Sequence, residues 1–455
     1  MVYKLKDKLP FLFVCCLLAI LSCTSTWIKP VVTIPGIILQ VITLCLYLLF
    51  AVPIIVKLVS DIKNLKSAAK NWINVVYYLF AVYYFGITVY RFLNGMEVKE
   101  NLYFAIIFFG GVALYSLFQA GLLNISGQAM EANIRWIAIL LILYRFMHCT
   151  VGKMLFEHQL INVNITTGAT AMLLPVLWVS CIREGLSIRQ KILTTLAFCG
   201  GIVVVLTTGS RAAFLLMTVN LCITFLVNLR NGKNLLRFVA LLVMASVVVV
   251  SLAVADIGDV RYSLYREMVI NSSSKPMDDQ DNQMDPDLPI EEEIEQDTQQ
   301  FEGSEEKEQA LAQSSNSDRM RQDLIHMGLK QIKLNPWIGT GDVLYNYQIS
   351  ETYAAVQSSH NFLIEVLCCF GVIGLGFIAV LFCLILFESK LFEKLMPRAW
   401  NTKVAMLQVI GFYLAFGFVQ PTVFEPVICA LFVLAIATCR AGLQELKDAK
   451  EGNKN

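Results

Sequence analysis

Apolar runs of about 20 residues recur along almost the whole chain, and each is long enough to cross a bilayer as a helix. Only 16% of the residues are charged, whereas soluble proteins carry about a quarter. A membrane β-barrel would show short alternating segments instead. The sequence therefore predicts an all-α polytopic membrane protein with about 12 transmembrane helices. We place them near residues 9–27, 32–56, 72–92, 102–123, 133–150, 164–182, 191–208, 211–229, 236–255, 360–387, 402–420 and 424–440.

The distribution of lysine and arginine predicts how these helices are oriented, because cytoplasmic loops carry the excess of both. With the N-terminus in the cytoplasm, the segments on that side hold 22 of the 36 basic residues, and the short loops on the other side hold six. The remaining eight lie in segment 256–359, between helices 9 and 10. We therefore expect transmembrane helices over 1–255 and 360–442, a cytoplasmic tail at 443–455, and segment 256–359 outside the cytoplasm.

The long segment 256–359 divides into two parts of different character. Residues 277–308 hold fourteen acidic side chains against the single Lys307, and so little apolar content favours a disordered insertion. A divalent-cation site is the alternative, but the glycine turn and regular ligand spacing of a calcium loop are missing. Helical periodicity returns over 319–334, where the apolar positions recur every three to four residues. They are Leu324, Ile325, Leu329, Ile332 and Leu334.

Cysteine usage predicts neither a metal site nor a disulfide framework. Almost all thirteen cysteines lie inside apolar runs, and no CxxC motif occurs. Such cysteines behave as small buried apolar side chains. The three lysines near the N-terminus and the apolar run after them resemble a signal peptide without a cleavage site, so we expect a retained first helix.

Arg211 lies in the sequence TTGSRAAF, in a very short turn between two predicted helices. An arginine at the edge of the hydrocarbon is costly, and a functional role is the default hypothesis for it. An arginine that extends to lipid headgroups is the alternative. The tight turn and the neighbouring hydroxyl of Ser210 favour a function.

A second polar constellation follows the acidic insertion. Arg319 and Arg321 open the amphipathic helix, and their planar guanidinium groups suit phosphate oxygens, although a solvated helix face is the alternative. The sequence NPWIGTG then brings Gly339 and Gly341, whose backbone amides can approach an anion. This loop is no Walker motif, so it does not indicate a nucleotide.

His360 comes directly before the next apolar helix, in a polar stretch that follows two serines. A histidine at a helix start is more often structural, but a neutral imidazole in this setting can act as a general base. Asn361 and Glu365 lie one helical turn apart, so they share a face, and a buried carboxylate there is either paired or functional. The glycines at 371, 374 and 376 favour close helix packing.

Together, these motifs resemble the bacterial O-antigen ligase and O-antigen polymerase family of membrane glycosyltransferases. The resemblance rests on an arginine fourteen residues before the NPWIGTG loop, the later HN-x-L and G-x-x-G elements, and the Ser210-Arg211 turn. The stretch NVNITTGATAMLLPV and the large loop before the last three helices agree with it. The acidic insertion departs from the family pattern.

The resemblance implies transfer of a glycan from undecaprenyl diphosphate to an acceptor hydroxyl, without a metal or other cofactor. By this resemblance Arg211 and Arg321 hold the diphosphate, Arg319 assists, and His360 activates the acceptor. It also implies a bacterial inner membrane protein among membrane lipids, with its active site in the periplasm and a glycolipid such as lipid A-core as acceptor. No nucleic-acid partner is expected.

Three alternatives remain open. We favour a ligase, but a polymerase shares its motifs, and a protein-glycosylating relative is a third enzyme. A polysaccharide transporter or flippase would also have twelve helices. The sequence shows no internal repeat and no pair of interrupted helices in matching halves, which are the marks of many transporters.

Overall fold

The computed structural model describes the chain in a series of helical segments, and all regular structure within them is helical. The described residues are 36–94, 99–119, 127–147, 149–150, 163–183, 185–208, 210–229, 231–255, 257, 260, 322–340, 361–389, 397–420, 428–429 and 431–439. The labelled helices are α3 (Gly36–Lys63), α4 (Leu65–Ala68), α5 (Trp72–Leu93), α6 (Lys99–Gln119), α7 (Gly127–Met147), α9 (Val163–Ile182), α10 (Ile188–Thr207), α11 (Arg211–Asn228), α12 (Gly232–Val254), α17 (Phe362–Glu388) and α18 (Pro397–Gly417). Residues 322–334 and 431–439 are also helical.

Five of these helices are long and apolar enough to cross a membrane: α5, α10, α11, α12 and α17. Two shorter apolar helices, Ala105–Leu117 and Thr167–Ile182, lie within α6 and α9. The chain is therefore a multi-pass helical membrane protein. The total of twelve helices and the side on which each loop lies stay predictions, and the first predicted span, 9–27, is outside the described residues.

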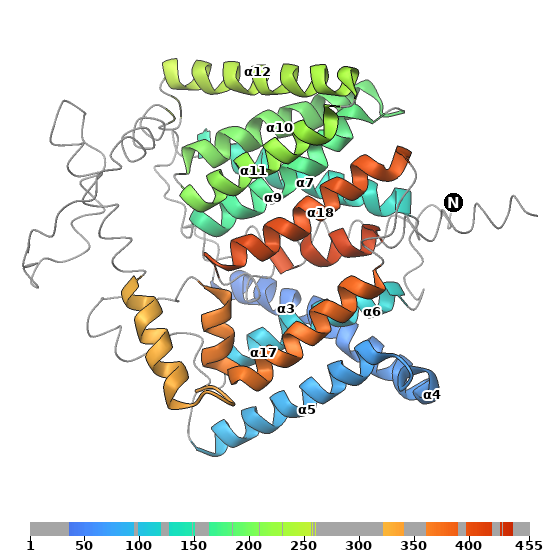
Figure 1. Ribbon diagram of the computed structural model, residues 1–455, viewed down its shortest axis with the longest axis vertical. Coiled ribbons are helices and arrows are strands. Elements are labelled where there is room, and N and C mark those ends of the chain that lie inside the picture. The colour runs from blue at the N-terminus through green and yellow to red at the C-terminus, as the bar shows by residue number, and fades with distance from the viewer. Residues whose placement is uncertain are drawn as a thin grey trace, which may run out of the picture.

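The helices lie side by side in one bundle, with α12 along one edge and α5 along the other (Figure 1). On the α12 side, α9 packs against α7, α10, α11 and α18, while on the α5 side α3 packs against α6 and α17 against α5. Stacked rings of Phe382 and Phe432, 5.1 Å apart, connect α17 to helix 431–439. A single buried cluster of apolar side chains runs through both sides.

The outer face of α12 is apolar, as expected for a helix that contacts lipid. Val243, Val247, Val250 and Val254 are all exposed on it, while Phe238 packs inward against Trp178 of α9 with ring centroids 4.9 Å apart. A continuous exposed apolar face is unusual on a soluble monomer. This face therefore agrees with a bilayer environment.

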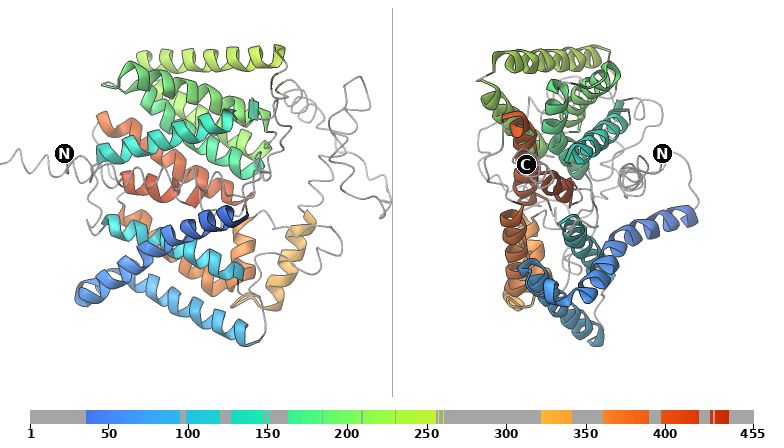
Figure 2. Two further views of the ribbon diagram at one scale, coloured as in Figure 1. Left: turned by 180° about the vertical axis from the view of Figure 1, so that it is seen from behind. Right: turned by 90° about the vertical axis from the view of Figure 1, so that its right-hand side faces the viewer.

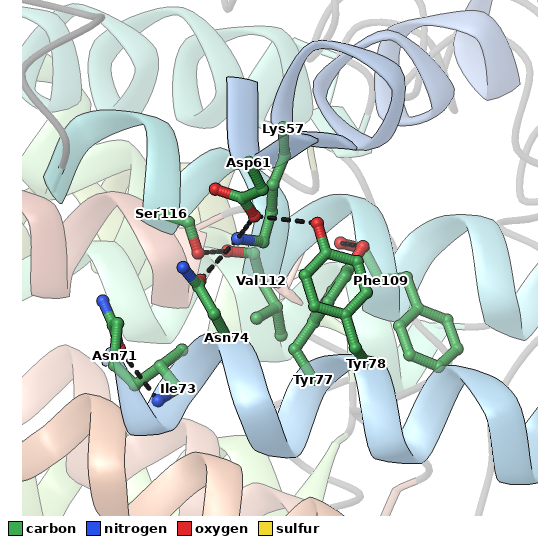
Figure 3. A network of polar contacts seen from close by, with 10 residues as sticks. All are labelled: Lys57, Asp61, Asn71, Ile73, Asn74, Tyr77, Tyr78, Phe109, Val112 and Ser116. Atoms are coloured by element: carbon green, nitrogen blue, oxygen red, sulfur yellow. Dashed lines mark hydrogen bonds and ion pairs between the residues drawn. The ribbon is translucent and has the colours of Figure 1, made fainter. Parts of the chain in front are cut away.

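A buried polar network fastens α3 to the first turns of α5 (Figure 3). The Lys57 ammonium donates to Asp61 at 2.7 Å and to Asn74 at 2.5 Å, and the Tyr78 hydroxyl donates to the same Asp61 oxygen at 2.7 Å. Lys57 is only 2% exposed, but its charge is paired within this network. Buried charges persist when they are paired and hydrogen-bonded, so the network has a structural role.

Candidate functional site

The main irregularity of the fold is a break in α17 at Gly371. This residue has φ 63° and ψ −168°, a conformation that interrupts the helix. Residues 362–370 stand across the direction of the rest of α17, as both Figure 1 and the left view of Figure 2 show. We call residues 362–370 the first segment of α17. The apolar run 360–387 predicted one continuous helix with Gly371 as a packing position, and the broken helix is a finding of the structure.

Residues 336–340, which we call the insertion loop, fill this break. The amides of Val372 and Ile373 donate to the carbonyls of Pro336 and Trp337, at 2.9 and 3.2 Å. In a continuous helix these two amides would bond to the carbonyls four residues earlier. The amide of Thr340 donates in turn to the carbonyl of Cys368 at 2.7 Å. The insertion loop therefore replaces hydrogen bonds that the helix loses.

Two glycines allow the loop and the helix to approach this closely. A Cβ atom on Gly371 would overlap the carbonyl group of Trp337, and one on Gly339 would lie 2.5 Å from the Cys368 carbonyl oxygen. Gly339 has φ 72°, and its amide donates to the Asn335 carbonyl at 2.9 Å. The structure thus gives Gly339 a conformational and packing role within the loop. Gly341 lies outside the described residues.

The helix at 322–334 packs across the first segment of α17. Leu324, Ile364 and Cys368 form a small buried cluster, and the Cys368 thiol lies 3.5 Å from the Gly328 carbonyl. The predicted periodicity holds for the packed side chains Ile325 and Ile332, which border this cluster. Two members of the predicted stripe differ, because Leu329 and Leu334 point away from the cluster and are exposed.

Asn361 begins the first segment and connects it to α18. Its side-chain oxygen accepts hydrogen bonds from the amides of Leu363 and Ile364, at 3.0 and 3.3 Å, as a helix N-cap does. Its side-chain nitrogen donates to the carbonyl of Phe418 at 3.1 Å. Glu365 follows one turn later and is fully buried, and its amide donates to the Asn361 carbonyl at 3.0 Å.

A row of contacts leads from α18 to the predicted Ser210-Arg211 turn. Phe416 packs on Gly168 near the start of α9, where a Cβ would overlap its ring. The neighbouring Thr167 hydroxyl donates to Thr208, at the end of α10, at 2.6 Å. The ends of α10 and α18 and the starts of α9, α11 and α17 therefore gather at one end of the bundle, which we call the site end.

Ser210 and Arg211 open α11 at the site end. Ser210 is 2% exposed, and within the described part of the chain its hydroxyl has no hydrogen-bond partner. Arg211 is half-buried at the first position of the helix. A helix N-terminus presents unpaired amides and a partial positive charge, both of which favour an anion. The start of α11 therefore combines an arginine, a buried hydroxyl and a helix terminus suited to a phosphate group.

The structure brings part of the predicted site together. Ser210, Arg211, Asn361 and Glu365 belong to helix starts at the site end, and Gly339 lies in the break of α17. His360, Arg319 and Arg321 lie outside the described residues. Within the described segments, no group of three or more histidine, cysteine, aspartate or glutamate residues has the arrangement of a metal site.

Sequence reasoning missed two residues that hold the break, Arg91 and Tyr83 of α5. The Arg91 guanidinium donates to the carbonyls of Cys369 and Ile338, at 2.5 and 3.2 Å, and the Tyr83 hydroxyl donates to Phe370 at 2.9 Å. In the count of basic residues Arg91 is one of the six assigned to the short loops outside the cytoplasm. Its position in the last turn of an apolar helix was an available signal, because a buried arginine there needs partners.

The fold and the site end define a multi-pass membrane protein with a polar constellation at one end of its helices. Residues 196–379 match the family model described as O-Antigen ligase. This match confirms the resemblance to O-antigen ligases and polymerases, a family of membrane glycosyltransferase-like enzymes. The matched region runs from α10 through the break in α17. No curated protein matches the chain.

Proposed function

We propose that the protein transfers a glycan from undecaprenyl diphosphate to an acceptor hydroxyl at the periplasmic face of a bacterial inner membrane, as an O-antigen ligase does. The observation that carries this proposal is the family match over 196–379, which contains Ser210, Arg211, His360, Asn361 and Glu365. The gathering of helix starts at the site end supports it, since a phosphate-bearing donor needs positive charge at one place on the membrane surface.

In the proposed reaction the acceptor oxygen attacks the anomeric carbon of the donor glycan, and the bond from that carbon to the diphosphate oxygen breaks. The acceptor proton passes to His360, and undecaprenyl diphosphate leaves with the electron pair. A diphosphate is already a good leaving group, so the site mainly has to neutralise its charge. Arg211 and Arg321 supply that charge without a metal ion, and Arg319 assists them.

The start of α11 gives Arg211 a fixed position for this task. Ser210 can donate its buried hydroxyl to a phosphate oxygen, and the helix terminus adds its favourable potential. Asn361 and Glu365 belong to the helix turn that begins directly after His360. In this proposal they hold that turn in place and line the acceptor side of the site.

Deleting the gene tests the reaction and separates its two main forms. A ligase predicts loss of all polymer from the cell surface and accumulation of lipid-linked polymer. A polymerase predicts surface glycan that carries a single repeat unit. Normal surface glycan in the deletion strain would contradict both.

The break in α17 bears on the transporter alternative, because interrupted helices mark many transporter binding sites. Those sites come in matching pairs, whereas no second break occurs in the other described helices. If the protein is a flippase, deleting its gene should deplete lipid-linked glycan on the periplasmic side. If it is a transferase, the deletion should make lipid-linked glycan accumulate there.

A further inference from the structure

Arg91 is a buried arginine that holds the backbone of the broken helix. It lies in the last turn of α5 and is 3% exposed. Taking a guanidinium out of water costs free energy unless strong acceptors replace the water. Here those acceptors are two backbone carbonyls, Cys369 in α17 and Ile338 in the insertion loop. One side chain therefore joins three separate parts of the chain.

The carbonyls around the break show why such a donor is needed. A continuous α17 would bond the carbonyls of Cys368, Cys369 and Phe370 to amides one turn later. In the structure Thr340 donates to Cys368, Arg91 donates to Cys369, and Tyr83 donates to Phe370. Buried backbone groups without a partner are costly, above all within a membrane. Each of these three carbonyls therefore accepts a hydrogen bond from a donor outside α17.

The geometry of a guanidinium suits this position. It carries several N–H donors in one plane and keeps its charge in a buried site. Hydrogen bonds from a charged donor are also roughly twice as strong as neutral ones. Arg91 can therefore fasten the insertion loop and the first segment of α17 to each other as well as to α5.

We infer that Arg91 is a positioning residue for glycan transfer, which makes this inference dependent on the proposed function. It fixes the insertion loop in the break of α17 and so sets the direction of the first segment, whose N-cap is Asn361 and whose preceding residue is His360. Arg91 contacts this segment at Cys369, near the end away from Asn361, and acts through it. The donor phosphate contacts proposed for Ser210 and Arg211 lie on α11, whereas the two carbonyls that Arg91 holds lie in α17 and the insertion loop.

This division predicts a specific kinetic effect. Loosening the first segment displaces the acceptor side of the site and leaves α11 in place. Replacing Arg91 should therefore lower kcat for transfer while KM for the lipid-linked donor stays within about twofold, because a contact that only orients the reacting groups acts on the transition state.

Two buried thiols report on the same break without any enzyme assay. Cys368 and Cys369 are fully buried beside it. If Arg91 holds the break closed, its removal should raise the rate at which these thiols react with a maleimide. Local opening is governed by the hydrogen bonds that hold a segment, and losing one to a charged group shifts such an equilibrium by about 10-fold or more.

The experiment compares purified full-length wild-type protein with Arg91→Gln and with Tyr83→Phe, which removes the neutral donor at the same break. Arg237→Gln and Tyr90→Phe are the matched controls, because both side chains are exposed. Maleimide labelling of Cys368 and Cys369 is resolved by mass spectrometry, and transfer is measured with an undecaprenyl-diphosphate-linked glycan as donor and lipid A-core as acceptor.

We expect Arg91→Gln to raise labelling of the two thiols and to lower kcat, each by about 10-fold or more. Tyr83→Phe should change both in the same direction by less, and the controls should change neither. If Arg91→Gln does not fold, Tyr83→Phe decides alone. Unchanged labelling, labelling that rises without a fall in kcat, or an effect on KM alone would overturn the inference. A wild-type protein without transfer activity would contradict the proposed function, and labelling would still test whether Arg91 holds the break.

Discussion

Gly371 of α17 lies directly against the backbone of Trp337, so closely that a Cβ atom on the glycine would overlap the tryptophan carbonyl group. The Trp337 carbonyl accepts a hydrogen bond from Ile373, two residues beyond that glycine, at 3.2 Å. The contact joins the insertion loop to the one helix that is broken among those described. It also fixes the point at which α17 changes direction.

Replacing Gly371 by alanine should therefore destabilise the protein. The conformation at Gly371, with φ 63° and ψ −168°, is essentially restricted to glycine and costs about 1–3 kcal/mol for a residue with a side chain, and the overlap with Trp337 adds to it. Gly376→Ala is the matched control, because nothing lies within 4 Å of a Cβ at that position of the same helix. Thermal unfolding in detergent should show a lower Tm for Gly371→Ala and little change for the control. Equal Tm values would contradict the described break.

Asn361 has two roles that substitution can separate. Asn361→Ala should lose the helix cap, at a cost of about 0.5–2 kcal/mol, together with the bond to Phe418. Asn361→Asp should keep the cap, because its oxygen still accepts from the amides of Leu363 and Ile364, but it has no N–H for Phe418. We expect both the Tm and the rate of transfer to fall from the wild type to Asn361→Asp and again to Asn361→Ala. An aspartate variant less stable than the alanine variant would show that the cap is not what the side chain provides.

The orientation in the membrane is tested by labelling single cysteines introduced into the chain. At position 272 or 314 in segment 256–359, a cysteine should react with a membrane-impermeant reagent once the outer membrane is permeabilised. Cysteines at position 63 or 233 should be protected, because the excess of lysine and arginine predicts a cytoplasmic location there. The reverse pattern would place the site end in the cytoplasm and remove it from any periplasmic donor.

The rate of transfer should depend on the planar shape of the Arg211 guanidinium as well as on its charge. Losing one charge-assisted contact to a buried phosphate costs about 1.5–3 kcal/mol, which corresponds to roughly a 10- to 150-fold fall in transfer. Arg211→Lys should lose nearly as much as Arg211→Ala, because an ammonium cannot present the planar fork that suits phosphate oxygens. Transfer by the lysine variant at close to the wild-type rate would show that a point charge suffices.

The long apolar runs predicted the position of several helices well, since such runs are evident from neighbouring residues alone. The predicted span at 72–92 became α5, Trp72–Leu93, and the one at 211–229 became α11, Arg211–Asn228. The turn at Ser210-Arg211 and the amphipathic helix before the NPWIGTG loop were also evident from local patterns.

The break in α17 was not predictable in this way. The residues on either side of Gly371 are equally apolar, so the apolar run continues through it. The donors and acceptors that replace the lost helix bonds come from Pro336, Trp337 and Thr340, and from Arg91 in a distant helix. Only the folded chain brings these groups together, and for the same reason Arg91 carried no sign of its role beyond its costly location.

The central claim is that His360 serves the transfer reaction at the site end, and one complementation measurement tests it most directly. A strain without the chromosomal gene receives either the wild-type gene or His360→Ala, with equal amounts of protein in the membrane, and the glycan on the cell surface is compared with the lipid-linked glycan that remains. We predict that wild type restores the surface glycan, whereas His360→Ala restores none and accumulates lipid-linked glycan, because acceptor activation is lost while donor binding persists. Surface glycan at close to the wild-type level in the well-expressed His360→Ala strain would contradict this account.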